Sequence, residues 1–304
     1  MPMNAPRILV VGSVNMDMSL PVPHLPCPGE TVLSKGCFLC PGGKGANQAV
    51  AAARLGAAAA MAGCVGDDAN GRTLLSHLGA EGVDTSFIRV RTQEGTGMAV
   101  IPVDEKGQNA ILVVPGANGA VSGEDGSAAL AARPWDAVLM QLEIPLETVF
   151  QTIAAAKAHG VLVVLDAGPA MRLPLRRLRG VDILSPNEGE ALALTGIDAS
   201  DDAGAVKAAA YLAENVPVPM VVLKLGARGA LCYQDHTPVF LPAEPADVKD
   251  TTAAGDCFTA AMTLRMCEQP DLMAAVRYAN QAAALCVSRS GAQPSLPTAA
   301  EITE

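Results

Sequence analysis

Short apolar runs alternate with helix-forming segments through most of this chain. The first run, RILVVGSV at Arg7–Val14, has a continuous apolar core and ends at Gly12-Ser13, whereas the alanine-rich GKGANQAVAAARL at 43–55 stops at Gly56. Wholly apolar strands are typical of sheets that are buried on both faces. Strands that alternate with helices indicate parallel βαβ units. We therefore expect an α/β fold, a doubly wound and mostly parallel sheet with helices on both faces.

The alternation continues as far as residue 226. We expect strands at 57–66, 135–142, 161–167, 181–187 and 219–226, and helices at 70–82, 146–160, from 188 and at 201–214. The 304 residues are within the range of one large domain. No repeat or low-complexity tract divides them, so we expect a single domain over 1–304.

Two stretches interrupt the pattern, at about 16–41 and 95–115. Both carry strand-like apolar runs with Pro or Gly turns and no helix between them. We expect them to pair as a small antiparallel sheet that stands off the body as a lid, the alternative being an ordinary surface excursion. A projecting apolar sheet exposes its face and edges to water, which predicts a homodimer packed lid against lid.

Charge and composition restrict the ligands. The chain has 31 acidic and 21 basic residues, a net charge of -10, and only 3% aromatic residues. A protein that binds a phosphate backbone normally has the opposite balance, and a single-strand platform needs aromatic side chains. We expect a small-molecule ligand and no nucleic acid.

Location and thiol state follow from similar arguments. No run is long and apolar enough to cross a bilayer and the N-terminus has no signal pattern, so we expect a cytoplasmic protein with no membrane partner. The eight cysteines are expected to be reduced. Cys37-x-x-Cys40 lacks a second ligand pair, and we interpret it as incidental.

The stretch DTTAAGDCFTAAM, 250–262, places small residues at the expected start of a helix. Ala253, Ala254 and Gly255 allow backbone N–H groups to approach an anion such as a phosphate closely. Asp256 then lies where a carboxylate could accept the proton of an attacking hydroxyl. The alternative is that Asp256 only caps the helix.

A second glycine cluster, CPGGKGANQAV at 40–50, also opens a helix. It is not a Walker A loop, since Gly45 replaces the required Ser or Thr, nor a G-x-G-x-x-G motif. Lys44 and Asn47 offer a cation and an amide suited to the hydroxyls of a polyol, and Asn15 and Asp17 follow the first strand. Ligands of open α/β sheets bind at such strand ends.

Six segments, VGSVNMDMSL, PGGKGANQAV, SPNEGEA, VLKLGARGA, DTTAAGDCF and SGAQPSLP, occur in the order seen in the ribokinase-like (phosphofructokinase-B type) sugar kinases. The chain resembles that family over essentially its whole length. The resemblance implies a ribokinase-like fold and ATP-dependent phosphorylation of D-ribose at O5 to ribose 5-phosphate. It also implies Mg²⁺ bound with ATP, and K⁺ as an activator.

The resemblance assigns a role to each matching position. Sugar contacts are implied for Asn15, Asp17, Gly43, Lys44, Asn47 and Glu143; the anion hole and base for Ala254, Gly255 and Asp256; nucleotide contacts for Asn187, Lys224, Gly226, Gly229 and Asn280; indirect Mg²⁺ binding for Glu190; and K⁺ binding for Asp250, Thr252, Gly291 and Ser295. One departure is Asp166, where close members of the family carry an asparagine. Its charge is expected to alter the electrostatics on the nucleotide side.

Simpler interpretations exist for several of these positions. Asn187 could only cap the next helix, Glu190 could lie on a solvated face, and the KLGARG glycines could form a hairpin turn. Asp250 could cap a turn and Ser295 could be a surface hydroxyl. The functional alternatives are a deoxyribose, nucleoside or 2-keto-3-deoxygluconate kinase, or a sugar-binding regulator without turnover. A dinucleotide oxidoreductase is disfavoured because the glycine fingerprint is missing.

Overall fold

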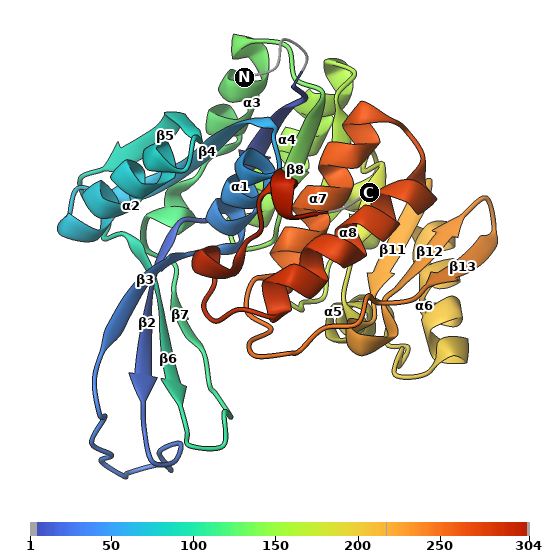
Figure 1. Ribbon diagram of the computed structural model, residues 1–304. Helices are drawn as coiled ribbons and strands as arrows, with labels where there is room; N and C mark the ends of the chain where they lie inside the picture. The colour runs from blue at the N-terminus through green and yellow to red at the C-terminus, as the bar shows by residue number, and fades with distance from the viewer. Residues whose placement is uncertain (1–4, 217, 303–304) are drawn as a thin grey trace.

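The computed structural model describes residues 5–216 and 218–302 (Figure 1). Its centre is a nine-stranded sheet, in which all neighbouring strands pair in parallel except β12 and β13 at one edge. Across the sheet the strands are β13 (Thr237–Leu241), β12 (Ala230–Gln234), β11 (Met220–Lys224), β10 (Ile183–Ser185), β9 (Leu162–Asp166), β8 (Ala137–Met140), β1 (Arg7–Val11), β4 (Ala58–Gly66) and β5 (Asp84–Arg91). The predicted doubly wound, mostly parallel sheet is confirmed.

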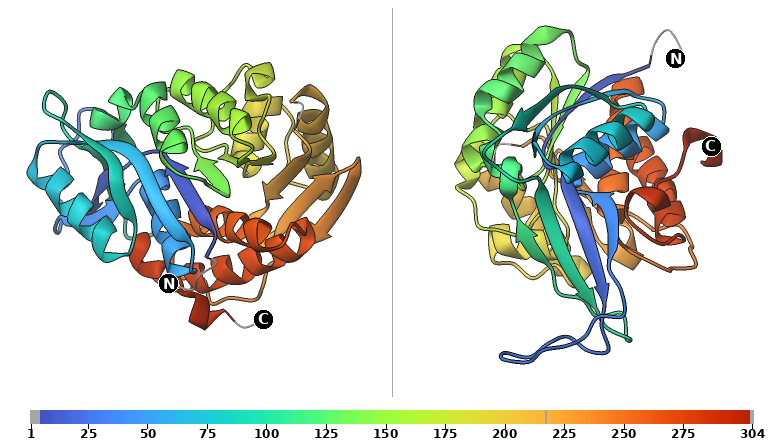
Figure 2. Two further views of the ribbon diagram at one scale, coloured as in Figure 1. Left: turned by 90° about the horizontal axis from the view of Figure 1, so that it is seen from above. Right: turned by 90° about the vertical axis from the view of Figure 1, so that its left-hand side faces the viewer.

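Helices cover both faces of this sheet (Figure 2). One layer consists of α1 (Lys44–Arg54), α2 (Ala69–Ala80), α7 (Ala254–Glu268) and α8 (Leu272–Val287), and the other of α3 (Gly123–Ala132), α4 (Leu146–Ala158), α5 (Glu188–Thr195) and α6 (Asp202–Asn215). Strand β1 shows why its last four residues are all apolar: Ile8 and Val10 pack into one core, Leu9 and Val11 into the other. Alternate side chains of a strand point to opposite faces, so both must be apolar.

Short 3₁₀ turns complete the chain: η1 (Gly116–Ala120), η2 (Leu175–Leu178), η3 (Gly226–Arg228), η4 (Gln293–Ser295) and η5 (Ala299–Glu301). No helix within the described part of the chain is both long and apolar enough to cross a membrane.

A separate four-stranded sheet projects from the body at the lower left of Figure 1. Its order is β3 (Phe38–Gly42), β2 (Asn15–Pro21), β6 (Gly97–Val103) and β7 (Leu112–Val114). The two interrupting stretches therefore do pair with each other, but the prediction of an antiparallel sheet is wrong for its central pair, because β2 and β6 run parallel. Strands β1 and β5 run in the same direction, so both finish at the same end of the main sheet. Strands β2 and β6 follow them in the chain and therefore enter the small sheet side by side and parallel.

Candidate active site

Two cavities adjoin at the N-terminus of α7. The first, which we call the polar cavity, has a volume of about 530 Å³ and includes Lys44, Asn187, Glu190 and Asp256 in its lining. The second, the apolar cavity, has a volume of about 550 Å³ and lies between α8 and the loop that follows β13. Lys224, Gly226, Thr251 and Gly255 line both cavities. A ligand with a charged end and an apolar end could therefore occupy the two cavities together.

The start of α7 exposes backbone donors instead of capping them. The N-cap residue is Ala253, which has a left-handed φ of 61° and no side-chain acceptor. Asp256 is the third residue of the helix and its carboxylate does not cap it, so the capping interpretation is wrong. Ala254 N–H donates to the Thr251 carbonyl at 3.3 Å, whereas the N–H groups of Gly255 and Asp256 have no acceptor among the described residues. Unpaired N–H groups at a helix N-terminus attract anions.

This finding changes one detail of the predicted anion hole. The sequence predicts the amides of Ala254 and Gly255 as its donors, but the left-handed turn at Ala253 directs the N–H of Ala254 back to Thr251. The available pair of donors is that of Gly255 and Asp256.

Two amides hold the Asp256 carboxylate from α1. Asn47 Nδ2 donates to its Oδ2 at 2.9 Å and Gln48 Nε2 to its Oδ1 at 3.0 Å. Burial raises the pKa of Asp256 to about 6, although the Lys44 ammonium opposes this change; the Asp166 carboxylate adds to it. A carboxylate with this pKa is ionised at neutral pH and is still a stronger base than an exposed aspartate, which suits a general base.

Lys44 lies on the inner side of the polar cavity. Burial alone lowers its pKa, but the surrounding carboxylates of Asp256, Asp166, Glu143 and Glu190 outweigh burial and raise the pKa above its ordinary value. Lys44 therefore keeps its positive charge and offsets part of the negative charge of these carboxylates.

Asn187 and Glu190 form a capping box at the start of α5. The side chain of Asn187 accepts from the Glu190 N–H at 2.8 Å, and Glu190 Oε2 accepts from the Asn187 N–H at 2.7 Å. The capping interpretation of Asn187 is thus confirmed, and it does not prevent the residue from lining the cavity. Glu190 is only 3% exposed, so the interpretation as a solvated face is wrong. Burial raises its pKa.

A third group of polar side chains lies where β2 leaves the main sheet. Asn15 and Asp17 are two residues apart on β2, and burial raises the pKa of Asp17 to about 7, with the Glu143 and Asp256 carboxylates adding to the effect. A Cβ on Gly42 would lie 2.0 Å from Asp17 Oδ2, so a side chain there would displace this carboxylate. Proximity of three acids raises the cost of ionising each of them.

Asp17 Oδ1 and Asn47 Oδ1 are buried acceptors that have no donor within the part of the chain that the structure describes. Buried polar atoms without a partner are rare in native proteins and require an explanation. Ligand hydroxyl groups would supply the missing donors, and a polyol carries several of them.

Glu143 and Gly43 shape the turn between these groups. Glu143 Oε2 accepts from Ser13 Oγ at 2.6 Å and from the Lys44 N–H at 3.1 Å. Gly43 has a φ of 90°, in the left-handed region, and a Cβ there would lie 2.8 Å from the Asn15 backbone nitrogen. Gly43 directly precedes α1 and Glu143 follows β8, and these contacts bring both residues beside the segment that joins β1 to β2.

Sequence reasoning missed several residues that hold the site. Asn118 donates to Asn15 Oδ1 at 2.7 Å and accepts from the Val14 N–H at 2.8 Å, and Ser13 holds Glu143. Gln48 and Thr259 contact acids at the centre. The only signal for Asn118 is its place in PGANGA, directly after β7, and that turn pattern alone does not indicate a site.

The apolar cavity contains the remaining predicted nucleotide residues. Gly226 and Gly229 form the turn between the antiparallel strands β11 and β12, so the hairpin interpretation is confirmed, and both also line the cavity. Asn280, on α8, is 6% exposed and donates to the Pro242 carbonyl at 2.8 Å. Phe258 forms part of the cavity wall. A cavity that is lined mainly by small apolar side chains and few polar groups suits the flat ring of a nucleotide base.

The four residues implied for K⁺ belong to one neighbourhood. Asp250 accepts from Thr252 Oγ1 at 2.6 Å and from the Gly291 N–H at 2.8 Å, which confirms that it caps a turn. Ser295 is fully buried rather than on the surface, and its Oγ lies 3.0 Å from Cys286 Sγ, which in turn is 3.8 Å from the Thr252 carbonyl oxygen. The segment offers oxygen atoms of the kind that bind a hard cation.

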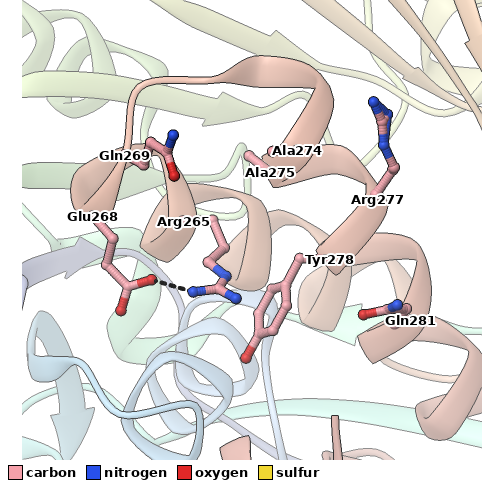
Figure 3. A pocket seen from close by; sticks show the side chains of 8 residues that line it. All are labelled: Arg265, Glu268, Gln269, Ala274, Ala275, Arg277, Tyr278 and Gln281. Atoms are coloured by element: carbon pink, nitrogen blue, oxygen red, sulfur yellow. Dashed lines mark hydrogen bonds and ion pairs between the residues drawn. The ribbon is translucent and has the colours of Figure 1, made fainter. Parts of the chain in front are cut away.

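A further cavity, of about 540 Å³, lies between α7 and α8 and is lined by Arg265, Glu268, Gln269, Ala274, Ala275, Arg277, Tyr278 and Gln281 (Figure 3). The Arg265 guanidinium lies 4.3 Å from the centre of the Tyr278 ring and 2.9 Å from Glu268. None of the predicted site residues lines this cavity.

Known proteins resemble the chain over nearly its full length. The family model described as pfkB family carbohydrate kinase matches residues 5–299. A ribokinase of Haemophilus influenzae is 39% identical, over 98% of this chain and 97% of its own, and a deoxyribokinase of Salmonella typhi is 33% identical, over 98% and 97%. The structure of Arabidopsis thaliana ribokinase complexed with ribose and ATP is 36% identical, with a TM-score of 0.89 over 98% of both chains.

Proposed function

Since this chain belongs to the pfkB family of carbohydrate kinases, we propose that it acts as a ribokinase and transfers the γ-phosphoryl group of ATP to O5 of D-ribose. The products are ribose 5-phosphate and ADP. The observation that carries the proposal is the pair of buried acceptors, Asp17 Oδ1 and Asn47 Oδ1, in the same site as the raised-pKa carboxylate of Asp256.

The sugar occupies the space between β2 and α1. Asp17 and Asn47 accept hydrogen bonds from ribose hydroxyls, which supplies the donors that these two buried oxygens lack. Asn15, Gly43, Lys44 and Glu143 complete the sugar site. Binding of a hydroxylated ligand here is favourable because the carboxylate and amide are already desolvated and fixed in place.

Asp256 is the general base of the reaction. Its carboxylate accepts the proton of the O5 hydroxyl as the oxygen attacks the γ-phosphorus and the bond to the leaving oxygen of ADP breaks. The N–H groups of Gly255 and Asp256, with the Lys44 ammonium, stabilise the negative charge on the transferring phosphoryl group. These groups are preorganised, because α7 and α1 hold them before the substrates bind.

ATP lies across both cavities. Its phosphates fit the polar cavity beside Lys224 and Asn187, and its base fits the apolar cavity beside Gly226, Gly229 and Asn280. Lys44 and Lys224 line the polar cavity and offer ammonium donors to the phosphates.

Mg²⁺ fits the polar cavity as a companion of the phosphates. Among the described residues no group of three or more His, Cys, Asp or Glu could hold a metal ion. Glu190 lines this cavity and would contribute indirectly: one of its oxygens is engaged by Asn187, and a Cβ on Gly168 would lie 2.6 Å from the other. Bound Mg²⁺ would neutralise charge between the phosphates.

K⁺ fits the oxygen atoms of Asp250, Thr252, Gly291 and Ser295. These residues join the loop before α7 to the loop after α8, through the hydrogen bond from Gly291 to Asp250. A cation bound there would rigidify the turn that carries Ala254 and Gly255 and would thereby increase turnover.

The small sheet closes over the sugar as a lid and also forms the contact between two copies of the chain. Phe38, Leu39, Leu112, Val113 and Val114 on its strands are all more than half exposed. Apolar surface and open strand edges of this kind are normally covered. A second lid offers the matching apolar strands, and so we infer a homodimer.

A substrate panel tests the proposal. With ATP, Mg²⁺ and K⁺ present, ADP release is compared for ribose, 2-deoxyribose, nucleosides and 2-keto-3-deoxygluconate. The highest kcat/KM for ribose supports the proposal. The deoxyribokinase relatives make deoxyribose the second candidate, and a higher kcat/KM for 2-deoxyribose would favour it. Sugar binding without ADP release would instead indicate a regulator.

A further inference from the structure

Gln48 lies directly behind the general base and is fully buried. Its Nε2 donates to Asp256 Oδ1 at 3.0 Å and also to Asp166 Oδ2 at 2.9 Å, so a single NH₂ group bridges two carboxylates. Ionised carboxylates only accept hydrogen bonds, and this fixes which end of the Gln48 amide faces them. The oxygen end of that amide accepts in turn from Gln141 Nε2.

Asp166 is the anchor of this arrangement. It is 1% exposed, at the end of β9, and its two oxygens receive donors from three elements. Lys224 Nζ donates to Oδ1 at 2.8 Å, while Gln48 of α1 and, at 3.2 Å, Thr259 Oγ1 of α7 donate to Oδ2. Its charge is therefore paired, and the carboxylate cannot rotate without losing a partner.

Asn47 and Gln48 are consecutive residues of α1, and each engages one oxygen of Asp256. The two bonds together fix the plane of the base carboxylate. Asn47 keeps a second polar atom, its Oδ1, free for a ligand, whereas the donors of Gln48 are used within the protein. Gln48 therefore touches the base but no substrate.

We propose that Gln48, anchored by Asp166, is a positioning residue that holds the Asp256 carboxylate in its productive orientation and links it to Lys224 on the phosphate side. This inference rests on the proposed phosphotransfer function. The link runs from Lys224 through Asp166 and Gln48 to Asp256 and connects the two substrate sites through three side-chain hydrogen bonds. Small displacements of a catalytic group reduce turnover more than they reduce binding.

The first test replaces Gln48 by methionine, which has a similar volume and no donor. Loss of a hydrogen bond to a charged group predicts a decrease in kcat of about 10- to 100-fold, with the KM values for ribose and ATP within about threefold of wild type. The control is Asp125→Asn on α3, which removes a buried carboxylate that is paired with Arg91 and that lines neither cavity. It should lower stability and leave kcat unchanged.

The second test uses Asp166, so that the proposal can still be tested if the Gln48 variant folds poorly. Asp166→Asn keeps an oxygen that accepts from Gln48 but turns its NH₂ group toward Lys224 Nζ, so it retains the Gln48 bond and loses the Lys224 pair. Its kcat should fall less than that of Asp166→Ala, which loses both and should decrease by about tenfold or more. The double variant Q48M/D166A should be no worse than Q48M alone, since residues that act as a unit are not additive.

Wild-type kcat in Q48M or D166A, an equal loss in D166N and D166A, or a loss confined to KM would overturn the inference. The wild type is measured first on the sugar panel. If it phosphorylates a sugar other than ribose, the proposed substrate is wrong, and the same variants are compared on that sugar. The two failures are thereby distinguished.

Discussion

Replacing Asp256 by asparagine should abolish most turnover and at the same time stabilise the protein. The carboxylate is 5% exposed and is the base in the proposed reaction. An amide cannot accept the proton of the sugar hydroxyl, and loss of a general base lowers kcat by about 10²- to 10⁴-fold.

The gain in stability follows from the raised pKa. Burial, together with the Asp166 carboxylate and against the Lys44 ammonium, raises the pKa of Asp256 from 3.8 to about 6, which corresponds to about 3 kcal/mol against the ionised form. Asparagine carries no charge, but its NH₂ group must face a donor from Asn47 or Gln48, which costs about 1–2 kcal/mol. A net stabilisation of about 1–2 kcal/mol at neutral pH is expected.

The raised pKa also predicts how the stability difference between wild type and Asp256→Asn changes with pH. Because the folded-state pKa is raised, the stabilising contribution of protonated Asp256 is fully present below pH 3.8 and is lost as the pH rises through about 6. The asparagine variant does not titrate, so its advantage over wild type should shrink between about pH 7.5 and about pH 4. Urea unfolding at several pH values measures this difference, and a coupled ADP assay measures kcat. A variant that keeps more than half of the wild-type kcat, or that is less stable at neutral pH, would refute the reasoning.

Three further predictions concern the sugar site, the lid and the cation. Asp17→Ala should weaken ribose binding in calorimetry by about 1.5–3 kcal/mol and leave ATP binding unchanged, because it removes a buried hydrogen-bond acceptor and leaves ribose hydroxyls unpaired; equal weakening of both ligands would contradict the assignment. Leu112→Glu should convert a homodimer to a monomer in light scattering, since it places a charge on the exposed lid; a wild-type protein that is monomeric and fully active would exclude the dimer. Exchange of K⁺ for a bulky ammonium ion at constant ionic strength should lower kcat, and Asp250→Ala should remove the activation; an unchanged kcat in protein free of K⁺ and Na⁺ would rule it out.

The sequence predicts the main sheet because its evidence is local. Apolar strands such as β1 and alanine-rich helices such as α1 identify themselves within a dozen residues. The small sheet is harder: its strands are recognisable, but the parallel pairing of β2 with β6 depends on how the main sheet directs them. Strand β5, DTSFIRVR, is assigned to no element from the sequence because it lies at an edge and mixes polar with apolar residues.

Some residues of the site are also recognisable from local sequence, whereas others depend on the fold. Asp256 and Lys44 lie in glycine-rich motifs that indicate anion binding by themselves. Gln48 does not stand out on its helix, because its partner Asp256 is 208 residues away and only the packing of α1 against α7 brings them together. Glu190 could not be distinguished from a solvated residue until the fold showed it to be buried. Residues that act through other residues are the ones that sequence patterns miss.

The most direct test of the account is the identity of the product. The protein is incubated with ATP, Mg²⁺, K⁺ and D-ribose, and the product is examined by phosphorus and proton NMR. The account predicts one ADP for each new phosphomonoester, with the phosphorus coupled to the two protons on C5 of ribose, and no such product from the Asp256→Asn variant. A phosphoester at any other position, or a full yield from the variant, would contradict it.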